Sequence, residues 1–335
     1  GSIGDTTLKI VNKNKNKYKI KLLTTNKQIK KIYQQALKYK VKKIVIFDKK
    51  NYRNYSSRFK NKKIKVYFNV KEALQDERKK INFGISAISG IDGMEPTLSI
   101  IKHVENLGIA NKESIICGWN LIKKELLKSK TQFIPVDSEH FSIWYSLNYE
   151  KDNNINDLYL TASGGPFYNL PLKKFKNIRI QDALKHPNWK MGKKISIDSS
   201  TLMNKVFEVI EAKNIFKINL KKISILIHPK SYVHAIIKFN SGMIKIIAHD
   251  TTMDIPIFNS IYQGKKNYNI KKNIDFIKLN QLNLQKVKLR KFPLIKILQL
   301  IPEKISLYET VIVSANDELV NMYLNGIINY KEITV

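Results

Sequence analysis

Short apolar runs alternate with segments of helical periodicity between residues 18 and 136, and this alternation constrains the fold more than any other feature. The run Lys43–Asp48 is apolar on both faces, as in a strand buried within a parallel sheet. The preceding segment Gln28–Tyr39 has its apolar residues at helical spacing. Strands that alternate with helices predict an α/β fold with a doubly wound parallel sheet. The remaining predicted strands are 18–23, 64–68, 84–90 and 132–136, and the remaining helices are 70–78, 95–106 and 119–128.

The pattern changes near residue 141 and predicts a second region of α+β type. Turn-forming residues such as Ser163-Gly164-Gly165-Pro166 separate the segments, and one strong helix is expected at 200–216. Residues 223–248 alternate as antiparallel strands. Residues 263–292 are rich in lysine and weakly patterned, which is typical of a linker. Helical periodicity returns from residue 293, and because so short a helical unit cannot bury its apolar face alone, we expect a partial C-terminal helical domain.

The charge of the chain narrows its possible partners. Lys and Arg total 60 against 27 Asp and Glu, and the net charge of +33 first suggests a polyanion. Only five of the 60 are arginine, however, and the lysines are scattered among Asn and Ile over the whole length. We therefore interpret the charge as a solvated surface and expect no nucleic-acid partner. Lysines also interrupt every apolar stretch, so no run reaches the ~18 residues of a membrane span, and no membrane partner is expected.

The cysteine content limits the cross-links and metal sites that the chain can form. Cys117 excludes an intrachain disulfide and a thiolate metal cluster, which fits a reducing compartment. It has no evident partner in the sequence and is interpreted as a core residue rather than a nucleophile.

Two carboxylates follow the predicted strand 132–136. Asp137 and Glu139 are two residues apart, with Ser138 between them and His140 after them. Ligands of parallel α/β sheets bind at the carboxyl ends of the strands, and carboxylate oxygens suit Mg²⁺ or Mn²⁺. The spacing therefore indicates a metal site, although a polar helix start with Asp or Ser as its cap explains it equally simply.

The helix expected at 200–216 has a polar face. Thr201, Asn204, Glu208 and Glu211 fall on one side of it, with Lys205 beside them. A third carboxylate from this face could complete the metal site. A solvated helix face is the alternative for the same pattern.

Three loop segments carry further chemistry. Ser163-Gly164-Gly165-Pro166 offers a hydroxyl and backbone amides to an anion. The segment 186–192 places His186, Trp189 and Met191 before a glycine, which is typical of a lid or of a buried anchor. Gly1-Ser2-Ile3-Gly4 before a helical pattern could end a phosphate loop or could be a cloning remnant.

Taken in order, these segments resemble one family, the 1-deoxy-D-xylulose 5-phosphate reductoisomerases of the non-mevalonate isoprenoid pathway. The matching segments run in family order over nearly the whole chain, and the ordered set is far more specific than any one of them. They are 1–4, 110–114, 135–140, 163–167, 186–192, 197–205 with Glu208, 228–231 with His234, and 315–316.

The resemblance implies a role for each matching residue. The divalent metal, Mn²⁺ or Mg²⁺, would be held by Asp137, Glu139 and Glu208. The catalytic set would be Lys112, Asp137, Glu139, His140, Glu208 and His234. Contacts to the sugar-phosphate substrate would come from Ser138, Ser163, His186, Trp189, Met191, Ser199, Asn204 and Lys205. Contacts to NADPH would come from Gly1, Ser2, Ile3, Gly4, Asn26, Lys27, Ala87, Asn111, Lys112, Glu113 and Gly192.

The resemblance also implies an architecture and a reaction. The NADPH-binding domain, of Rossmann type, would span 1–137 and the α+β catalytic domain 138–262, followed by a linker at 263–288 and a truncated C-terminal helical domain at 289–335. The family rearranges 1-deoxy-D-xylulose 5-phosphate to an aldehyde and reduces it with NADPH to 2-C-methyl-D-erythritol 4-phosphate. A homodimer is implied as well, in a bacterial cytoplasm or, alternatively, a plastid.

Some features depart from the family pattern and leave alternatives open. The chain opens inside a motif and closes soon after a helix, so we expect a chain truncated at both ends. The segment expected to hold the 2′-phosphate reads Thr25-Asn26-Lys27, so a preference for NADPH rests on Lys27. The alternatives are another NAD(P)-dependent dehydrogenase on a Rossmann scaffold, of semialdehyde or homoserine type, and an inactive remnant of the first family.

Overall fold

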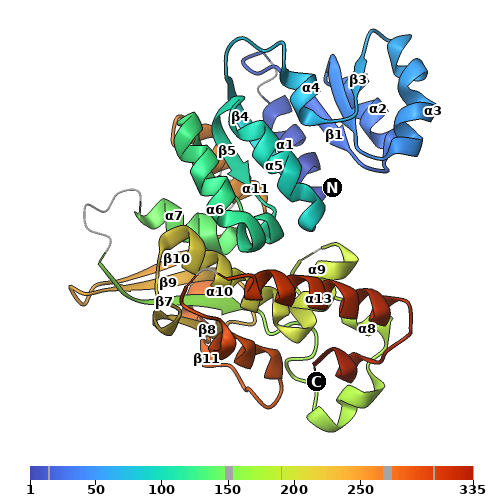
Figure 1. Ribbon diagram of the computed structural model, residues 1–335. Coiled ribbons are helices and arrows are strands. Elements are labelled where there is room, and N and C mark those ends of the chain that lie inside the picture. The colour runs from blue at the N-terminus through green and yellow to red at the C-terminus, as the bar shows by residue number, and fades with distance from the viewer. Residues whose placement is uncertain (14–15, 148–153, 190, 267–273, 305, 335) are drawn as a thin grey trace.

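The computed structural model describes residues 1–335 apart from 14–15, 148–153, 190, 267–273, 305 and 335. Its N-terminal half contains two three-stranded parallel sheets, ordered β1-β2-β3 and β4-β5-β6 (Figure 1). The strands are β1 (Leu22–Thr25), β2 (Lys43–Ile46), β3 (Lys65–Tyr67), β4 (Ile81–Ser86), β5 (Val104–Ile109) and β6 (Gln132–Pro135). The helices are α1 (Ser2–Asn12), α2 (Ile29–Lys38), α3 (Lys49–Lys60), α4 (Val70–Leu74), α5 (Met94–Ile101) and α6 (Lys112–Ser129).

The α/β prediction is confirmed in this half, with one correction to the sheet. β1 pairs with β2, and β4 with β5, in parallel register, and helices connect the strands. The described strands form two hydrogen-bonded sheets rather than one continuous doubly wound sheet. Each sheet has its own buried cluster, centred on Ile44 in the first and on Leu107 in the second.

Several predicted boundaries move. Helix α3 is absent from the prediction because its sequence is mostly polar and buries only Phe59 completely. The helix predicted at 95–106 ends at Ile101, where a turn closes from the His103 amide to the Ile100 carbonyl, and β5 begins at Val104. The predicted glycine loop 1–4 is instead the start of α1, which begins at Ser2 with Gly1 as its cap.

The second half is built on a five-stranded sheet in the order β10-β9-β7-β8-β11. Its strands are β7 (Ile155–Ala162), β8 (Ile223–Ile227), β9 (Val233–Phe239), β10 (Ile244–Ala248) and β11 (Gln285–Lys286). The antiparallel prediction for 223–248 is confirmed for β9 and β10 but is wrong for β8, which pairs in parallel with β7. Helices α7 (Ser138–Leu147) and α10 (Met203–Phe216) pack on this sheet through Ile143, Leu158 and Val209.

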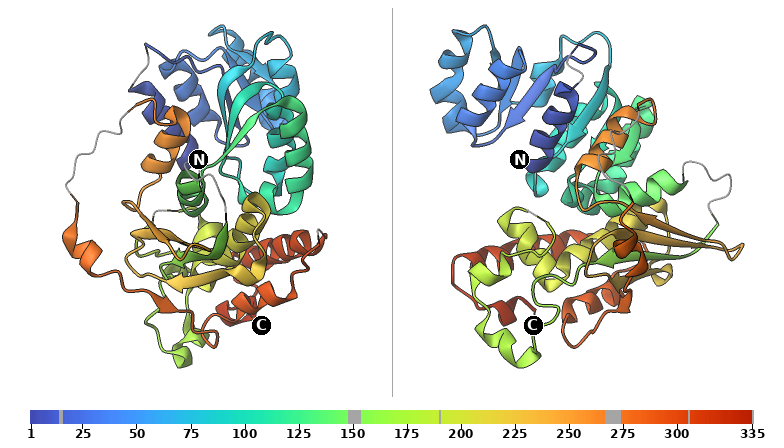
Figure 2. Two further views of the ribbon diagram at one scale, coloured as in Figure 1. Left: turned by 90° about the vertical axis from the view of Figure 1, so that its left-hand side faces the viewer. Right: turned by 180° about the vertical axis from the view of Figure 1, so that it is seen from behind.

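Helices complete both halves of the molecule. Helix α11 (Asp254–Tyr262) returns to the N-terminal half, where it packs on α1, as Figure 2 shows. Helix α13 (Tyr308–Leu324) buries Val320 and Tyr323 against Phe167 and Ile197. The other helices are α8 (Ile180–Ala183), α9 (Lys193–Thr201) and α12 (Phe276–Asn280). Short 3₁₀ turns lie at Ile91–Gly93, Leu172–Asn177, Leu220–Lys222, Pro293–Leu300 and Tyr330–Thr334.

The single helix predicted at 200–216 is two helices. Leu202 ends α9 and precedes α10 with a φ of 62°, a left-handed conformation that side chains rarely adopt. Its side chain is buried with Ala162 and Ile227, so packing holds this conformation in place. Helix α10 begins directly after this residue, and its Asn204 donates to Glu208, whose carboxylate lies close to Asp137 at the end of β6.

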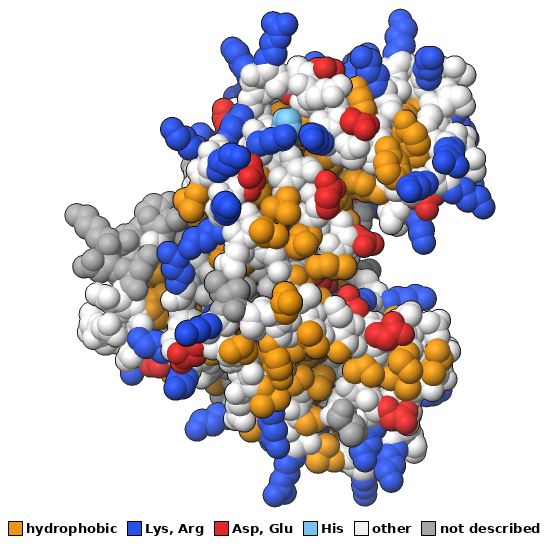
Figure 3. Space-filling view, in the orientation of Figure 1, with side chains coloured by type: hydrophobic (Ala, Val, Ile, Leu, Met, Phe, Trp, Pro, Cys, Tyr) orange, Lys and Arg blue, Asp and Glu red, His pale blue; other side chains and the backbone are white. Residues whose placement is uncertain are grey.

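The surface of the molecule is rich in basic side chains and is hollowed on one side. Figure 3 shows Lys and Arg side chains spread over the visible face and an indentation between its upper and lower halves. None of the helices in the described part of the chain has the length and apolar character needed to cross a membrane. The domain boundaries at 137, 262 and 288 stay predictions, and residues 267–273 of the predicted linker lie outside the described residues.

Gly165 provides a test of how tightly the Ser163 turn packs on α9. Its φ is +67°, and an added Cβ would lie 2.9 Å from the Ser199 carbonyl oxygen. Gly165→Ala should therefore lower the free energy of unfolding by about 1–3 kcal/mol for the backbone strain and by more for the collision. Gly242→Ala is the matched control, because its φ is +86° but nothing lies within 4 Å. Equal losses for the two variants in urea denaturation would contradict the close packing.

Candidate active site and metal centre

Two carboxylates stand where the second parallel sheet ends. β6 ends at Pro135 and α7 begins at Ser138, so Asp137 lies in the junction and Glu139 in the first turn of the helix. The Asp137 carbonyl accepts the Phe141 amide at 2.8 Å and thereby starts the helix. From the opposite side, α10 directs Glu208 towards them. Ligand oxygens of Asp137, Glu139 and Glu208 all lie within 4.8 Å of one another.

Two buried ammonium groups lie among these carboxylates. The Lys112 Nζ lies 3.3 Å from Asp137 Oδ2 and 3.4 Å from Glu208 Oε1, and it donates to Asn204 Oδ1 at 2.7 Å. The Lys205 Nζ donates to Glu139 Oε1 at 2.7 Å and also pairs with Glu208. Lys112 comes from the first turn of α6, where Asn111 caps the helix by accepting the Ser114 amide at 2.5 Å.

Burial and crowding set the protonation of these groups. Burial and the neighbouring Glu208 raise the pKa of Glu139 to about 7, and Lys205 offsets this only in part. Burial also opposes ionisation of Asp137, but Lys112 and His140 outweigh it and hold the pKa of that carboxyl well below its usual range. Three carboxylates this close together, with the pKa of Glu139 raised, form an oxygen donor set that suits a divalent cation.

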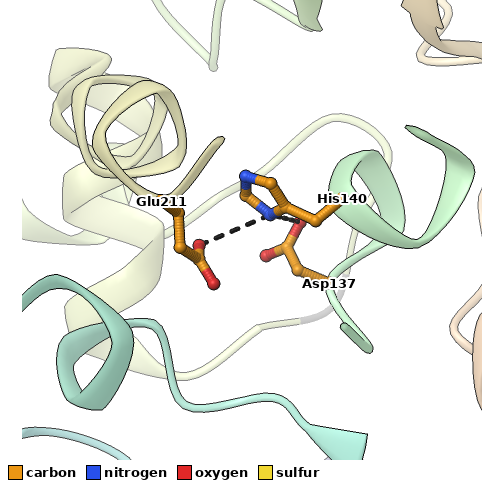
Figure 4. A group of neighbouring side chains, drawn as sticks. All are labelled: Asp137, His140 and Glu211. Carbon is orange, nitrogen blue, oxygen red and sulfur yellow. Dashed lines mark ion pairs between the residues drawn. The ribbon is translucent and has the colours of Figure 1, made fainter. Parts of the chain in front are cut away.

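His140 lies between Asp137 and Glu211 and pairs with both, as Figure 4 shows. The His140 Nδ1 lies 3.4 Å from Glu211 Oε2 and 3.6 Å from Asp137 Oδ1, and its Nε2 lies 2.8 Å from the Glu208 carbonyl. Burial would lower the pKa of His140, but Glu211 and Asp137 outweigh it and raise that pKa to about 9. The protonated ring can then donate at both nitrogens, to a carboxylate and to the Glu208 carbonyl.

Glu211 is a residue that the predicted site set omitted. It is buried, and burial raises its pKa to about 7. The signal for it was available, since Glu211 lies three positions after Glu208 on the same predicted helix face. What the sequence did not show is the partner, because His140 comes from a helix more than sixty positions away.

The predicted anion-binding residues gather next to this centre. Ser163 follows β7, and its Oγ lies 3.1 Å from His186 Nε2 and accepts the Gly165 amide at 3.1 Å. Ser199 packs behind this turn, with its carbonyl against Gly165. Burial and the nearby Lys205 lower the pKa of His186 to about 4, so the imidazole is neutral near pH 7. The Ser163 hydroxyl and the His186 imidazole thus lie together, with the Lys205 ammonium nearby and the Ser199 backbone behind the turn.

The segment 186–192 is anchored at one end. The His186 Nδ1 accepts the Trp189 amide at 2.9 Å and the Asn188 amide at 3.1 Å. Trp189 is half-buried rather than fully exposed, with its ring 6.4 Å from that of His234 between centroids. His234 stacks on His249 at 3.7 Å, a partner that no sequence pattern indicated. Met191 is half-buried and Gly192 is exposed, at the start of α9.

The predicted cofactor residues lie along the ends of the parallel strands and the helices that follow. Asn111 is buried and donates to the Gly90 carbonyl at 2.8 Å, which ties α6 to the loop after β4. Glu113 is buried, whereas Ala87 is half-buried in that loop. Asn26 and Lys27 are exposed just beyond β1. Gly1, Ser2, Ile3 and Gly4 form the exposed to half-buried start of α1.

The fold and the site together define an oxidoreductase with a nucleotide-binding α/β half and a carboxylate metal centre. Three family models match the chain: 1-deoxy-D-xylulose 5-phosphate reductoisomerase at residues 1–118, its C-terminal domain at 133–216, and a DXP reductoisomerase C-terminal domain at 250–335. The chain therefore belongs to the 1-deoxy-D-xylulose 5-phosphate reductoisomerase family and is an NADP-dependent enzyme. The family predicted from the ordered motifs is confirmed.

Individual relatives agree with this assignment. The reductoisomerase of Pelagibacter ubique is 54% identical over 100% of this chain and 87% of its own length. That of Sulfurihydrogenibium is 34% identical over 99% of this chain and 86% of its own. The Zymomonas mobilis enzyme in complex with NADPH has a TM-score of 0.88 at 28% identity, covering 100% of this chain and 87% of that one. A reductoisomerase with NADPH, fosmidomycin and magnesium has a TM-score of 0.91 at 29% identity, covering 100% and 85%.

His186 gives a prediction for the pH dependence of stability. Its pKa is about 4 in the folded protein against an ordinary value of 6.5, so protonation favours unfolding. The stabilisation that the neutral His186 gives to the folded protein is complete above pH 6.5 and is lost as the pH falls towards 4. Between pH 7 and pH 5, His186→Gln should lose about 1–2 kcal/mol less of its free energy of unfolding than the wild type. Parallel pH curves from chemical denaturation would contradict a buried, neutral His186.

Proposed function

We propose that this chain converts 1-deoxy-D-xylulose 5-phosphate to 2-C-methyl-D-erythritol 4-phosphate, with NADPH as the hydride donor, at the centre formed by Asp137, Glu139 and Glu208. The observation that carries the proposal is the crowding of these three carboxylates within 4.8 Å at the end of β6. Membership of the reductoisomerase family and the likeness to enzymes solved with NADPH support it.

The three carboxylates would hold the divalent metal. Their donor set is all oxygen and anionic, which suits Mg²⁺ or Mn²⁺, and a related enzyme was solved with magnesium. A bound divalent cation supplies Lewis acidity that polarises a ketone and stabilises alkoxide charge. His140 and Glu211 would keep the Asp137 carboxylate in the orientation that it needs as a ligand.

The remaining residues of the centre would bind and orient the substrate. Lys112, Ser138 and Asn204 surround the carboxylates with one ammonium, one hydroxyl and one amide, which can contact the oxygenated carbons. The phosphate would be held by Ser163, His186, Ser199, Asn204 and Lys205. This group is remote from the reacting carbons, and its binding energy can therefore orient them.

The segment 186–192 would cover the bound substrate. Trp189 and Met191 present large apolar surfaces, and closing them over the site would exclude water from the reactive aldehyde. His234 meets the Trp189 ring edge-on and would help to position it. Because His186 anchors this segment through two amides and also faces Ser163, phosphate binding and closure would be linked.

NADPH would lie across the strand ends of the N-terminal half. The start of α1, at Gly1 to Gly4, offers backbone amides and the positive end of a helix dipole to the pyrophosphate. Lys27 is exposed beyond β1 and would pair with the 2′-phosphate, with Asn26 beside it. Ala87, Asn111, Lys112, Glu113 and Gly192 would line the nicotinamide end, next to the metal centre.

A direct assay tests the metal and the reaction together. NADPH oxidation should require both 1-deoxy-D-xylulose 5-phosphate and Mg²⁺ or Mn²⁺, should stop with EDTA and should return on adding the metal. Glu208→Gln should reduce kcat roughly a hundredfold or more, since it removes one anionic ligand, with little change in melting temperature. The exposed Glu105→Gln is the control. Activity that survives EDTA would instead favour a metal-independent dehydrogenase, and a wild type with no turnover would indicate an inactive remnant.

We also propose that the chain forms a homodimer and works in a bacterial cytoplasm, which its bacterial relatives support. The edge strand β10 supports self-association, because Ile244 and Ile246 on it are 56% and 51% exposed and Met243 just before it is 68% exposed. Light scattering after gel filtration should give a mass near twice 38.9 kDa. Ile244→Lys combined with Ile246→Lys should lower it towards one chain, and a monomeric wild type would contradict the dimer.

A further inference from the structure

One lysine outside the metal centre contacts three carboxylates at once. The Lys194 Nζ lies 3.0 Å from Glu113 Oε1 on α6, 3.0 Å from Asp198 Oδ2 on its own helix and 3.0 Å from Asp317 Oδ1 on α13. An ammonium group has three N–H donors, so each carboxylate can take one. Lys194 therefore links α9 to a helix of the N-terminal half and to a C-terminal helix.

This contact is not explained by the local stability of α9. A cation in the first turn of a helix opposes the helix dipole, so Lys194 is unfavourable for α9 taken alone. Burial also opposes its charge, but Asp198, Glu113 and Asp317 outweigh burial and raise the pKa of Lys194. The Phe207 ring lies 5.1 Å from the ammonium and adds a cation–π contact. The stabilisation that Lys194 provides therefore comes from linking α9 to α6 and α13.

The anchored helix carries a predicted phosphate ligand. Asp198 is buried, with one oxygen towards Lys194 and the other accepting Asn316 Nδ2 at 2.8 Å. Successive side chains on an α-helix are about 100° apart, so fixing Asp198 also fixes the direction of Ser199. The backbone of Ser199 packs against Gly165, in the turn that begins with Ser163. Ser199 is thereby held between the Lys194 anchor and this turn.

We propose that Lys194 is a positioning residue for substrate binding, which sets the rotation of α9 so that Ser199 faces Ser163 and His186 around the phosphate. Lys194 itself contacts neither substrate nor metal in this arrangement. The inference rests on the proposed function, because the phosphate role of Ser199 comes from the family. In this proposal Lys194 is the residue that holds Ser199 in place at the phosphate site.

The first test separates substrate binding from the chemical step. Lys194→Met keeps the apolar stem and removes the charge, and it should raise the KM for 1-deoxy-D-xylulose 5-phosphate about tenfold, while kcat changes less than about threefold. Lys194→Arg should restore part of the loss, since it keeps the charge but not three tetrahedral donors. The matched control is Lys193→Met, an exposed neighbour on the same helix. An unchanged substrate KM in Lys194→Met would overturn the proposal.

The second test asks whether Lys194 acts through Ser199. In a double-mutant cycle, Lys194→Met and Ser199→Ala should be strongly non-additive, and the double variant should have a substrate KM close to that of the worse single variant. Effects that multiply independently would show that Lys194 acts elsewhere. A general loss of stability caused by Lys194→Met would lower the melting temperature equally with and without Ser199→Ala. It would not make the two effects on substrate KM non-additive.

A binding measurement keeps the proposal testable apart from turnover. Fosmidomycin, the compound present in a related solved structure, can be titrated calorimetrically with Mg²⁺ into the wild type and into Lys194→Met. We expect weaker binding by about tenfold in the variant. A wild type that binds fosmidomycin but does not turn over would overturn the proposed reaction alone, and equal affinities would overturn the positioning role alone. A wild type that does neither would overturn both.

Discussion

The charge balance around four buried or half-buried carboxylates is the interaction on which the rest of the site depends. These are Asp137, Glu139, Glu208 and Glu211, and the cationic groups facing them are Lys112, His140 and Lys205. Removing any cation would leave a carboxylate uncompensated in a medium of low dielectric, which costs several kcal/mol. The three cations come from α6, α7 and α10, so the site and the packing of these helices form together. When all four carboxylates are ionised they exceed these cations by one charge, so a bound cation would favour the fully ionised state.

The same balance explains why the two halves of the chain meet where they do. Lys112 belongs to the helix after β5, whereas Glu208 and Lys205 belong to a helix that packs on the other sheet. Apolar contacts between α6 and α10, through Ile116, Val206 and Ile210, bring these charges within reach of one another. Burial of apolar surface thus provides the stabilisation, and the ionic groups set the relative placement of the two helices.

The sequence was sufficient for the elements whose signal is local. Strand 43–48 and helix 28–39 follow from apolar spacing, and the carboxylates of the site follow from their place after a strand and from motifs shared with a family. The sequence was insufficient where contacts between distant residues determine the local structure. The break at Leu202 needs a buried side chain to hold a left-handed residue, and α3 is stabilised by Phe59 against a polar sequence. The Glu211–His140 pair and the contacts of Lys194 with Glu113 and Asp317 join residues that no local pattern relates.

Burial finally distinguishes the lysines of this very basic chain. A lysine on the surface costs little and can accumulate without a role, whereas a buried ammonium must be paired to remain charged. Among the residues that the structure describes, Lys112 and Lys205 are the buried lysines, at 7% and 4% exposure, and both face the metal centre. Lys194 is partly buried and meets three carboxylates. The net charge of +33 therefore gives little information about function. The few lysines that the fold buries or partly buries are better indicators of the functional positions.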